Sequence, residues 1–376
     1  MIAGNRNKAS SRYGPVTRLL YKVHLDAPLL AGICAVLTLS LMVLYSASGS
    51  DIDTVYRQCA RIGVAMLVLA FTAQLNISWI RRAAPWIYSI GIITLALVDI
   101  AGEVGGGAQR WLDIGVRFQP SEIMKLAVPA MLAWVLHDRP LPTSAGINAL
   151  LLAMILVPVA MIAIQPDLGT AIMITLTGLI VIFLAGIDLR YVLSAIPLSM
   201  GAAFVLWQFY MLPYQKQRVM TLLDPETDPL GSGYHIIQSK IAIGSGGLFG
   251  KGLLNGSQGK LEFLPEQTTD FIFAVIGEEL GFIGVTALII IYLLIVARGF
   301  FIAVAAQDTF SRLLAGSISL TFFFYVFVNT AMVTGLLPVV GVPLPLVSAG
   351  GTSMVTLSAG FGILMSIHTH RKLLPR

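Results

Sequence analysis

The stretch LEFLPEQTTDFIFAVIGEELGFIG, residues 261–284, decides which kind of fold this chain adopts. A polar loop ends at Asp270, and the chain then continues as a long, mostly apolar run to about residue 297. A helix needs about 20 mostly apolar residues to cross a bilayer, so this run is predicted to span a membrane. It contains Glu278 and Glu279. Charges inside a span indicate pairing or function, because each costs about 2.5–3.5 kcal/mol to insert.

The composition of the whole chain agrees with that prediction. Of its 376 residues, 56% are hydrophobic and 11% are charged, whereas a soluble domain has about a quarter of its residues charged. The chain is therefore predicted to be a polytopic membrane protein. Its two cysteines, Cys34 and Cys59, fit no metal-binding spacing and are predicted to be small core residues. The five histidines are scattered along the chain, so no zinc site is expected.

About ten segments have the length and composition of membrane spans, which predicts an all-α polytopic integral membrane protein. These segments are 27–47, 58–75, 84–101, 121–136, 148–165, 168–187, 191–211, 270–297, 311–334 and 350–368. The divisions at Pro166–Asp167 and at Gly186 could be drawn differently. The first segment is expected to be a retained helix, because its apolar run exceeds the roughly 7–15 residues of a signal-peptide core.

An even number of spans places both termini on the same side of the membrane. If that side is the cytoplasm, the inner segments hold 14 of the 24 basic residues but only 4 of the 19 acidic ones, in line with the positive-inside rule. We therefore expect a multi-pass protein of the cytoplasmic (inner) membrane, with a cytoplasmic segment at 1–26, a transmembrane domain at 27–368 and a cytoplasmic tail at 369–376. The net charge of +5 follows from this topology, so no nucleic-acid partner is expected.

Residues 212–269 are predicted to form one long extracytoplasmic loop with short interfacial helices. Four isoleucines stand among its polar residues and predict an amphipathic helix along the membrane surface; they are Ile236, Ile237, Ile241 and Ile243. The stretch GSGGLFGKG at 244–252 does not fit a nucleotide-binding loop, because Ser245 and Gly252 occupy the positions of the required Gly and Ser/Thr. Its glycines are expected to permit tight turns near a lipid head group.

Three charged residues near span ends each have two interpretations. Glu122 and Lys125 stand three residues apart on one face of a predicted helix, so they could pair with each other or line a functional cavity. Asp167 follows Pro166, so it could cap the next helix or belong to a site at the outer membrane edge.

Basic residues gather in the outer loops. They are Lys216, Arg218, Lys240, Lys251 and Lys260 in the long loop, with Arg110 and Arg117 in a neighbouring glycine-rich segment. Such residues often form only a solvated surface. Beside the outer leaflet, they could instead bind the diphosphate of a lipid-linked substrate.

Asp270 also has two interpretations. An acidic residue in the first turn of a helix is stabilised by the helix dipole by about 0.3–1 kcal/mol, and capping by Thr268 or Thr269 would make this stretch only a helix start. The alternative is a carboxylate that faces an outer polar pocket within reach of Arg218 or Lys240.

The chain resembles the SEDS (shape, elongation, division and sporulation) family over nearly its full length after Lys22. The motifs that carry the resemblance are YSASG (45–49), GAQRWLDIG (107–115), RFQPSEIMKLAVP (117–129), QPDLGTA (165–171), RVMTLLDPETDPLGSGYHIIQSKIAIGSGGLFGKG (218–252), LEFLPEQTTDFIFAVIGEELG (261–281) and GVPLPLVSAGG (341–351). The C-terminal MSIHTHRK (365–372) resembles the rod-elongation branch of that family rather than the division branch.

The resemblance implies a peptidoglycan glycosyltransferase that polymerises lipid II on the outer face of the membrane during cell elongation and rod-shape maintenance. It also implies a complex with a class B penicillin-binding transpeptidase and other elongation-complex membrane proteins. The essential aspartate of the family falls on Asp270, and its polar cavity residues fall on Glu122, Lys125 and Asp167. Ala349 departs from the family pattern, which commonly has Tyr at this position.

Joined with this resemblance, the residues suggest a mechanism. Asp270 would act as the general base that takes a proton from the attacking sugar hydroxyl. The expected substrate-binding residues are Arg110, Glu122, Lys125, Asp167, Arg218, Lys240 and Ser348. The expected substrates are lipid II and a glycan carried on a polyprenyl diphosphate, whose departure requires charge neutralisation. A divalent cation (Mg or Mn) could share that role, although no carboxylate cluster has a clear metal spacing.

Two alternative functions use the same residues differently. A lipid II flippase would use Glu122, Lys125 and Glu278 as a polar path through the membrane. A non-catalytic scaffold would only activate the transpeptidase.

Overall fold

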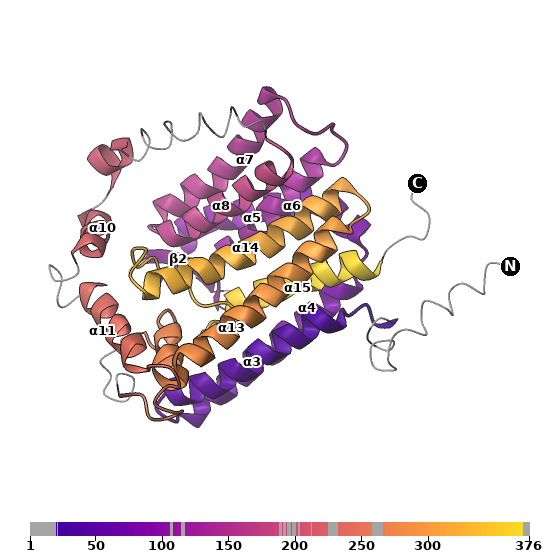
Figure 1. Cartoon of the computed structure of the whole chain (residues 1–376). Helices are drawn as coiled ribbons and strands as arrows, with labels where there is room; N and C mark the ends of the chain where they lie inside the picture. The colour runs from indigo at the N-terminus through magenta and orange to yellow at the C-terminus, as the bar shows by residue number, and fades with distance from the viewer. Residues whose placement is uncertain are drawn as a thin grey trace.

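The computed structural model describes residues 20, 22–105, 108–113, 117–187, 190, 193, 197, 201, 204–211, 213–224, 232–257 and 266–370. Its body is a bundle of long helices that lie alongside one another, with two shorter helices, α10 and α11, at one end (Figure 1). We call this end, which also holds Asp270, the loop end. The opposite end is the terminal end, where His24 stacks on His370 with ring centroids 3.9 Å apart.

The helices of the bundle are α3 (Ala27–Ala47), α4 (Ile52–Gln74), α5 (Ile77–Ala101), α6 (Pro120–Leu136), α7 (Ala145–Ile164), α8 (Leu168–Leu184), α13 (Ile272–Val304), α14 (Thr309–Val333) and α15 (Gly351–Thr369). The shorter elements are η1 (Leu206–Tyr210), α10 (Pro213–Leu223) and α11 (Ser232–Ser245). Six of the described helices are long and apolar enough to cross a membrane. The chain is therefore a mostly helical, multi-pass membrane protein.

The predicted spans on described residues are confirmed as helices. Helices α4 and α5 begin six and seven residues earlier than predicted because a polar cap precedes each: Asp51 accepts hydrogen bonds from the first turn of α4, and Asn76 does so for α5. Of the 21 residues of the predicted span 191–211, ten lie outside the described residues, as do most of the predicted segment 1–26 and the end of the segment 369–376.

A small sheet departs from the predicted all-α fold. Strands β1 (Glu103–Gly105), β2 (Ala108–Asp113) and β3 (Arg117–Phe118) form an antiparallel sheet in that order. Glu103 pairs with Trp111, and Asp113 pairs with Arg117. The all-α prediction missed this sheet because its strands are too short to show a clear period-2 pattern.

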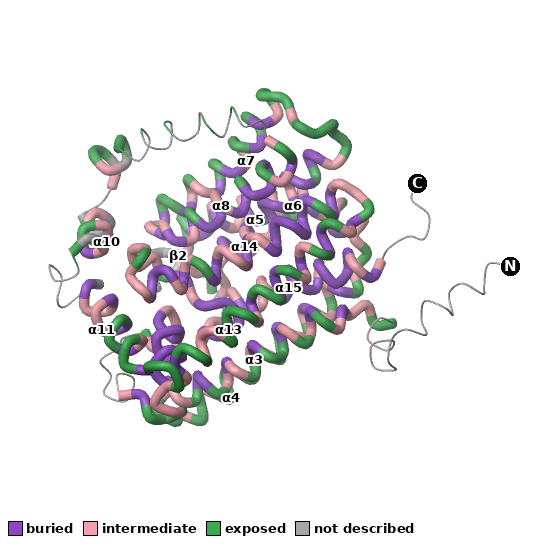
Figure 2. The backbone as a smooth tube through the Cα atoms, viewed as in Figure 1, coloured by how far each residue is buried: buried purple, intermediate pink, exposed green. Residues whose placement is uncertain are grey.

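Helix α14 is the most enclosed of the six long apolar helices (Figure 2). In its most apolar stretch 67% of residues are buried, against 17% for α4. It packs along α6, α8 and α13, while α15 packs along α4. The prediction that Cys34 and Cys59 are core residues is wrong, since both are exposed on outer helices that present apolar side chains to their surroundings.

A break in α13 is the main irregularity of the bundle. Gly281 adopts φ +65°, ψ −165°, which divides α13 into two helical parts. The segment 246–252, here called the glycine clamp, binds the backbone at this break. Gly247 and Leu248 accept from the amides of Phe282 and Ile283 at 2.9 and 3.1 Å. The amides of Lys251 and Gly252 donate to the carbonyls of Glu278 and Glu279 at 3.0 and 2.9 Å.

The clamp explains why this stretch is rich in glycine. A Cβ atom at Gly250, whose φ is +77°, would lie 2.1 Å from the carbonyl oxygen of Glu279. The glycines therefore permit tight turns, as predicted, but here the turns allow close contact with another backbone. Helix α11, predicted from its isoleucines, precedes the clamp and packs against α13; Ile236 is buried, whereas Ile241 is exposed.

An ion pair and a hydrogen bond close the terminal end. Arg298 of α13 forms a bidentate pair with Asp26, with nitrogen–oxygen distances of 3.0 and 2.6 Å. His24 Nδ1 lies 3.2 Å from the Thr369 hydroxyl. Burial, and to a lesser degree the adjacent His370, lower the pKa of His24 below its usual value. The first and last described segments of the chain are thereby joined.

Candidate functional site

Asp270 lies in the turn that precedes α13. The residue at the N-cap of α13 is Phe271, and no side chain caps that helix. Thr269 directs its hydroxyl to Glu266, 2.6 Å from Oε2. Because neither Asp270 nor the threonines cap α13, the simple helix-start interpretation of this stretch is wrong.

Three successive carbonyls hold this turn in place. The carbonyl of Thr268 accepts from the amide of Ala349 at 2.8 Å. That of Thr269 accepts from the Ser348 hydroxyl at 2.6 Å, and that of Asp270 accepts from Asn329 Nδ2 at 2.9 Å. Every carbonyl from 268 to 270 is therefore bound to a partner distant in sequence, which fixes the backbone that carries the Asp270 carboxylate.

The loop between α14 and α15, residues 334–350, supplies most of these partners. Asn329 Nδ2 also donates to the carbonyl of Val342 at 2.7 Å, so a single amide group holds both this loop and Asp270. The Asp270 carboxylate faces Gly341: a Cβ atom there would lie 3.6 Å from its Oδ2. Ala349 stands where the family pattern commonly has Tyr. This difference leaves the hydrogen bond to the Thr268 carbonyl unaffected, because its donor is the backbone amide of Ala349.

Ser348, a predicted substrate-binding residue, has its hydroxyl engaged within the protein. It donates to the carbonyl of Thr269 at 2.6 Å and accepts from the amide of Leu344 at 2.8 Å. The side chain is buried. These contacts make Ser348 a residue that positions the turn next to Asp270.

Arg110, Gln119 and Asp167 form a polar cluster at the loop end. Asp167 caps α8, since its Oδ1 accepts from the amide of Thr170 at 3.2 Å. Its Oδ2 accepts from Gln119 Nε2 at 3.2 Å and lies 3.6 Å from Arg110 Nε. The capping interpretation of Asp167 is therefore confirmed, whereas its role in a site at the outer membrane edge stays a prediction. Strand β2 places Arg110 here, and its guanidinium also donates to the carbonyl of Pro166 at 3.0 Å.

Glu122 and Lys125 form a buried ion pair, 2.6 Å between Lys125 Nζ and Glu122 Oε1. The ammonium also lies 4.9 Å from the ring centre of Tyr325 on α14. The pair lines a small cavity of about 30 Å³ between α6, α14 and α15. Tyr325 and Asn329 stand one turn apart on the same face of α14, so this pair lies about one helical turn from the group that holds Asp270.

The predicted basic residues of the long loop are only partly placed. Lys240 on α11 lies beside the end of α14, where a Cβ atom at Gly335 would be 2.8 Å from its Nζ. Helix α11 also approaches the Asp270 turn, because the His235 and Phe271 rings stack with centroids 5.5 Å apart. Arg218 belongs to α10, and its side chain lies outside the described residues.

Glu278 and Glu279 hold the segment that follows the glycine clamp. Glu278 Oε1 lies 2.7 Å from Lys251 Nζ and accepts from the amide and hydroxyl of Ser257 at 2.8 and 2.9 Å. Glu279 Oε1 accepts from the Ser46 hydroxyl at 2.5 Å. Both carboxylates therefore tie α13 to its neighbours.

Among the residues that the structure describes, no group of three or more His, Cys, Asp or Glu side chains could hold a metal ion. Two described cations lie at the loop end: Arg110 belongs to the Asp167 cluster, and Lys240 lies on α11, the helix whose His235 stacks on Phe271.

Some residues of this site were not predicted. Asn329 is fully buried and is the single polar residue in the run VFVNTAMV apart from its neighbouring threonine. A lone amide in an apolar span is a signal of a necessary hydrogen bond, and it could have been recognised. Gln119 and Tyr325 carry no such signal, because their role depends on which helices meet.

The family of the chain follows from its similarity to known proteins. The family model FtsW/RodA/SpoVE, described as "Cell cycle protein", matches residues 18–373. The chain is 52% identical over 356 residues to the peptidoglycan glycosyltransferase MrdB of Escherichia coli (strain K12), covering 94% of this chain and 96% of that relative. It is 37% identical over 366 residues to the probable peptidoglycan glycosyltransferase FtsW of Trichlorobacter lovleyi, covering 93% and 94%. The chain belongs to this family.

Solved structures agree with the assignment. A chain from the work described as "Structural coordination of polymerization and crosslinking by a peptidoglycan synthase complex" superposes with a TM-score of 0.81 at 34% identity, over 93% of this chain and 98% of that one. The rod shape determining protein RodA of Thermus thermophilus superposes with a TM-score of 0.70 at 29% identity, over 92% and 98%. The bundle described above is thus the fold of this family.

Proposed function

We propose that this protein is a peptidoglycan glycosyltransferase that polymerises lipid II during cell elongation and rod-shape maintenance, with Asp270 as its general base. The observation that carries the proposal is the set of three hydrogen bonds that fix the carbonyls of residues 268–270. A general base must be held within reach of the proton it removes, and such bonding fixes the backbone that carries the carboxylate. The 52% identity to the glycosyltransferase MrdB supports the same activity.

In the proposed reaction the sugar 4-hydroxyl of lipid II attacks the anomeric carbon of the growing glycan. The new carbon–oxygen bond forms as the bond to the polyprenyl diphosphate breaks, and the diphosphate leaves with the electron pair. The proton of the attacking hydroxyl passes to the Asp270 carboxylate. A well-placed base of this kind typically accelerates a reaction by about 10²–10⁴-fold.

The departing diphosphate requires nearby positive charge. Arg110 and Lys240, both at the loop end, are candidates for this role, and Arg218 is a further candidate on α10. Lys125 is paired with Glu122 inside the bundle, so we assign this pair to the wall of the small cavity between α6, α14 and α15. A divalent cation could share the neutralisation.

We also propose ten spans, with both termini in the cytoplasm and the loop end outside the cytoplasmic (inner) membrane. The six long apolar helices account for part of this count. The 17-residue helices α6 and α8, the 19-residue α15 and the segment 191–211 would supply the rest. The positive-inside rule supports the orientation, which places Asp270 on the face where an extracytoplasmic substrate is presented.

The proposed partner is a class B penicillin-binding transpeptidase. The support is the similarity to a chain from a peptidoglycan synthase complex that coordinates polymerization and crosslinking. Other membrane proteins of cell elongation are expected to join the same assembly.

Incubation of the purified protein with fluorescent lipid II, with and without the transpeptidase, tests the proposed function. Glycan strands resolved on a gel are the expected product, and their digestion by a muramidase confirms their identity. A flippase would move lipid II across vesicles without making polymer. A scaffold would give no polymer unless the partner contributed its own polymerase, so the absence of strands under both conditions would contradict the proposal.

A further inference from the structure

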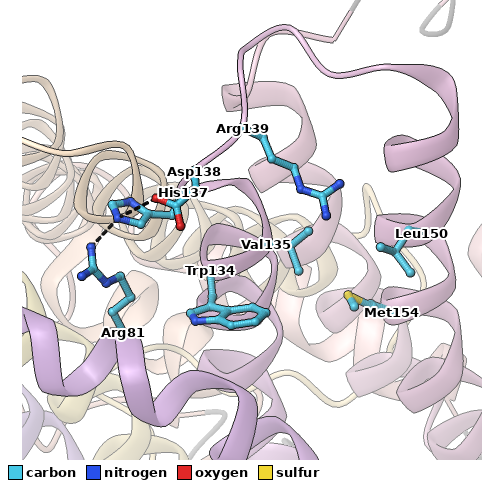
Figure 3. Close-up of a pocket in the computed structure, with 8 residues that line it drawn as sticks. All are labelled: Arg81, Trp134, Val135, His137, Asp138, Arg139, Leu150 and Met154. Carbon is cyan, nitrogen blue, oxygen red and sulfur yellow. Dashed lines mark hydrogen bonds and ion pairs between the residues drawn. The ribbon is translucent and has the colours of Figure 1, made fainter.

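A basic pocket opens at the terminal end of the bundle, far from Asp270. It has a volume of about 490 Å³ and is lined by Arg81, Trp134, Val135, His137, Asp138, Arg139, Leu150 and Met154. Figure 3 shows Arg81 beside His137, with Arg139 across the pocket above Val135. Helices α5, α6 and α7 therefore each contribute to its walls.

The position of the pocket in the bundle is set by neighbouring contacts. Helix α5 begins at Ile77, and the residues just before it contact both ends of the described chain. Gln74 Nε2 donates to the carbonyl of Val23 at 2.5 Å, and the Ser366 hydroxyl donates to the carbonyl of Leu75. Arg81, one turn into α5, thus lies at the terminal end.

The charge of the pocket favours an anion. Arg81 contacts His137 Nε2, and Arg139 is exposed at the rim. The facing acid is Asp138, 3.5 Å from His137, but its side chain is 93% exposed and directed to solvent. Arg82 adds an exposed cation beside Arg81. Two arginines therefore line the pocket against a single, outward carboxylate.

An apolar groove continues from this pocket along α5 and α7. It has a volume of about 450 Å³ and is lined by Tyr88, Ser89, Ile92, Ile93, Ala153, Met154 and Val157. Met154 lines both spaces. The Tyr88 hydroxyl donates to the carbonyl of Met154 at 2.8 Å, and this hydrogen bond joins α5 to α7 within the groove. From Arg81 to Ile93 the rise is about 18 Å, close to the roughly 15 Å thickness of one leaflet of the hydrocarbon core.

We propose that this pocket and groove form a binding site for an anionic phospholipid of the leaflet at the terminal end. The phosphate of the head group would lie between Arg81 and Arg139, and one acyl chain would lie in the groove between α5 and α7. Basic pockets between helices on the cytoplasmic side recognise anionic head groups in this way. The site is separate from the proposed lipid II site, because it lies at the opposite end of the bundle.

Native mass spectrometry of the purified full-length protein tests this proposal. The protein is exchanged from detergent into equal mixtures of dioleoyl-phosphatidylglycerol and dioleoyl-phosphatidylcholine, which differ in head-group charge but not in acyl chains. The wild type is expected to retain phosphatidylglycerol selectively. The double variant Arg81→Gln/Arg139→Gln should lose about 30-fold in that selectivity, from roughly fivefold for each cation near a membrane surface.

Three further variants keep the test decisive. Arg139→Gln leaves the Arg81–His137 contact intact and should lose about fivefold in selectivity. Ala153→Trp fills the groove and should reduce retention of both lipids. Arg312→Gln removes an exposed cation at the start of α14, at the same end of the bundle, and should behave as wild type. Equal selectivity in the double variant and the wild type, or an equal loss in Arg312→Gln, would overturn the proposal. Displacement of the bound lipid by free glycerol phosphate would also overturn it, because a simple anion site would then suffice.

Discussion

The carboxylate of Asp270 depends on a single buried amide for much of its placement. Asn329 binds the carbonyls of both Asp270 and Val342, so the variant Asn329→Leu leaves two carbonyls without their donor. We expect a stability loss of about 1–3 kcal/mol and a 10- to 100-fold lower polymerisation rate, because a small misplacement of a catalytic group has effects of that order.

Thermal unfolding in detergent and the lipid II assay measure these two effects. The matched control is Thr330→Val, whose hydroxyl bonds only to carbonyls of its own helix, at Val326 and Phe327. It should change stability by less than about 0.5 kcal/mol. A wild-type rate in Asn329→Leu would show that this amide does not position Asp270.

Variants of the buried pair Glu122–Lys125 distinguish a structural role of this pair from a role in substrate binding. Side-chain exposures are 7% and 10%, so Glu122→Gln or Lys125→Met alone leaves an isolated buried group and should destabilise the protein by about 3–5 kcal/mol. The double variant Glu122→Leu/Lys125→Met should regain most of that stability. If the pair also binds substrate, the double variant folds but polymerises slowly. A double variant as unstable as either single one would contradict the pairing argument.

At the scale of the element, the glycine clamp holds the break in α13. Gly250→Ala would place a Cβ atom 2.1 Å from the carbonyl oxygen of Glu279 at a φ of +77°, a conformation that costs about 1–3 kcal/mol in a residue other than glycine. We expect lower thermal stability and faster proteolysis between residues 246 and 257. Gly244→Ala is the control, because it has no atom within 4 Å of the added Cβ and lies in a helix. Equal proteolysis of the two variants would refute the role of the clamp.

At the same scale, the sequence predicts where most of the helices lie but not all of the contacts between them. Long apolar runs predict the helices, and Asp51 and Asn76 show why two of them start earlier: a polar cap extends a helix beyond its apolar run. Sequence also singled out Asp270, Asp167 and the Glu122–Lys125 pair. It did not predict the Asn329 contacts or the Ser348 hydrogen bonds, because these depend on how the 334–350 loop folds over the end of α13.

At the scale of the whole molecule, the length of α13 explains the carboxylates in its first part. Its 33 residues would extend about 50 Å, more than the roughly 30 Å hydrocarbon core of a bilayer. The part after Gly281, residues 282–304, is about 35 Å long and suffices to cross it. Glu278 and Glu279 then lie at the loop-end boundary of the bilayer, where Lys251, Ser257 and Ser46 bind them.

The proposed orientation gives a direct labelling prediction. In a background with Cys34→Ser and Cys59→Ser, Asp53→Cys places a thiol at the exposed start of α4, and Asp138→Cys places one at the terminal end. A membrane-impermeant maleimide should label the first in intact cells and the second only after lysis. The reverse pattern would invert the proposed topology and place Asp270 in the cytoplasm.

The central claim, that Asp270 is the base of a glycan polymerase, is tested most directly by Asp270→Asn. Asparagine keeps the size of the side chain and leaves the three backbone hydrogen bonds at residues 268–270 available, but it cannot accept the proton. The expected polymerisation rate with purified lipid II is lower by about 10²–10⁴-fold, with thermal stability and transpeptidase binding unchanged. Asp53→Asn, which removes an exposed carboxylate from α4, should polymerise at the wild-type rate. A rate for Asp270→Asn equal to that of Asp53→Asn would contradict the assignment.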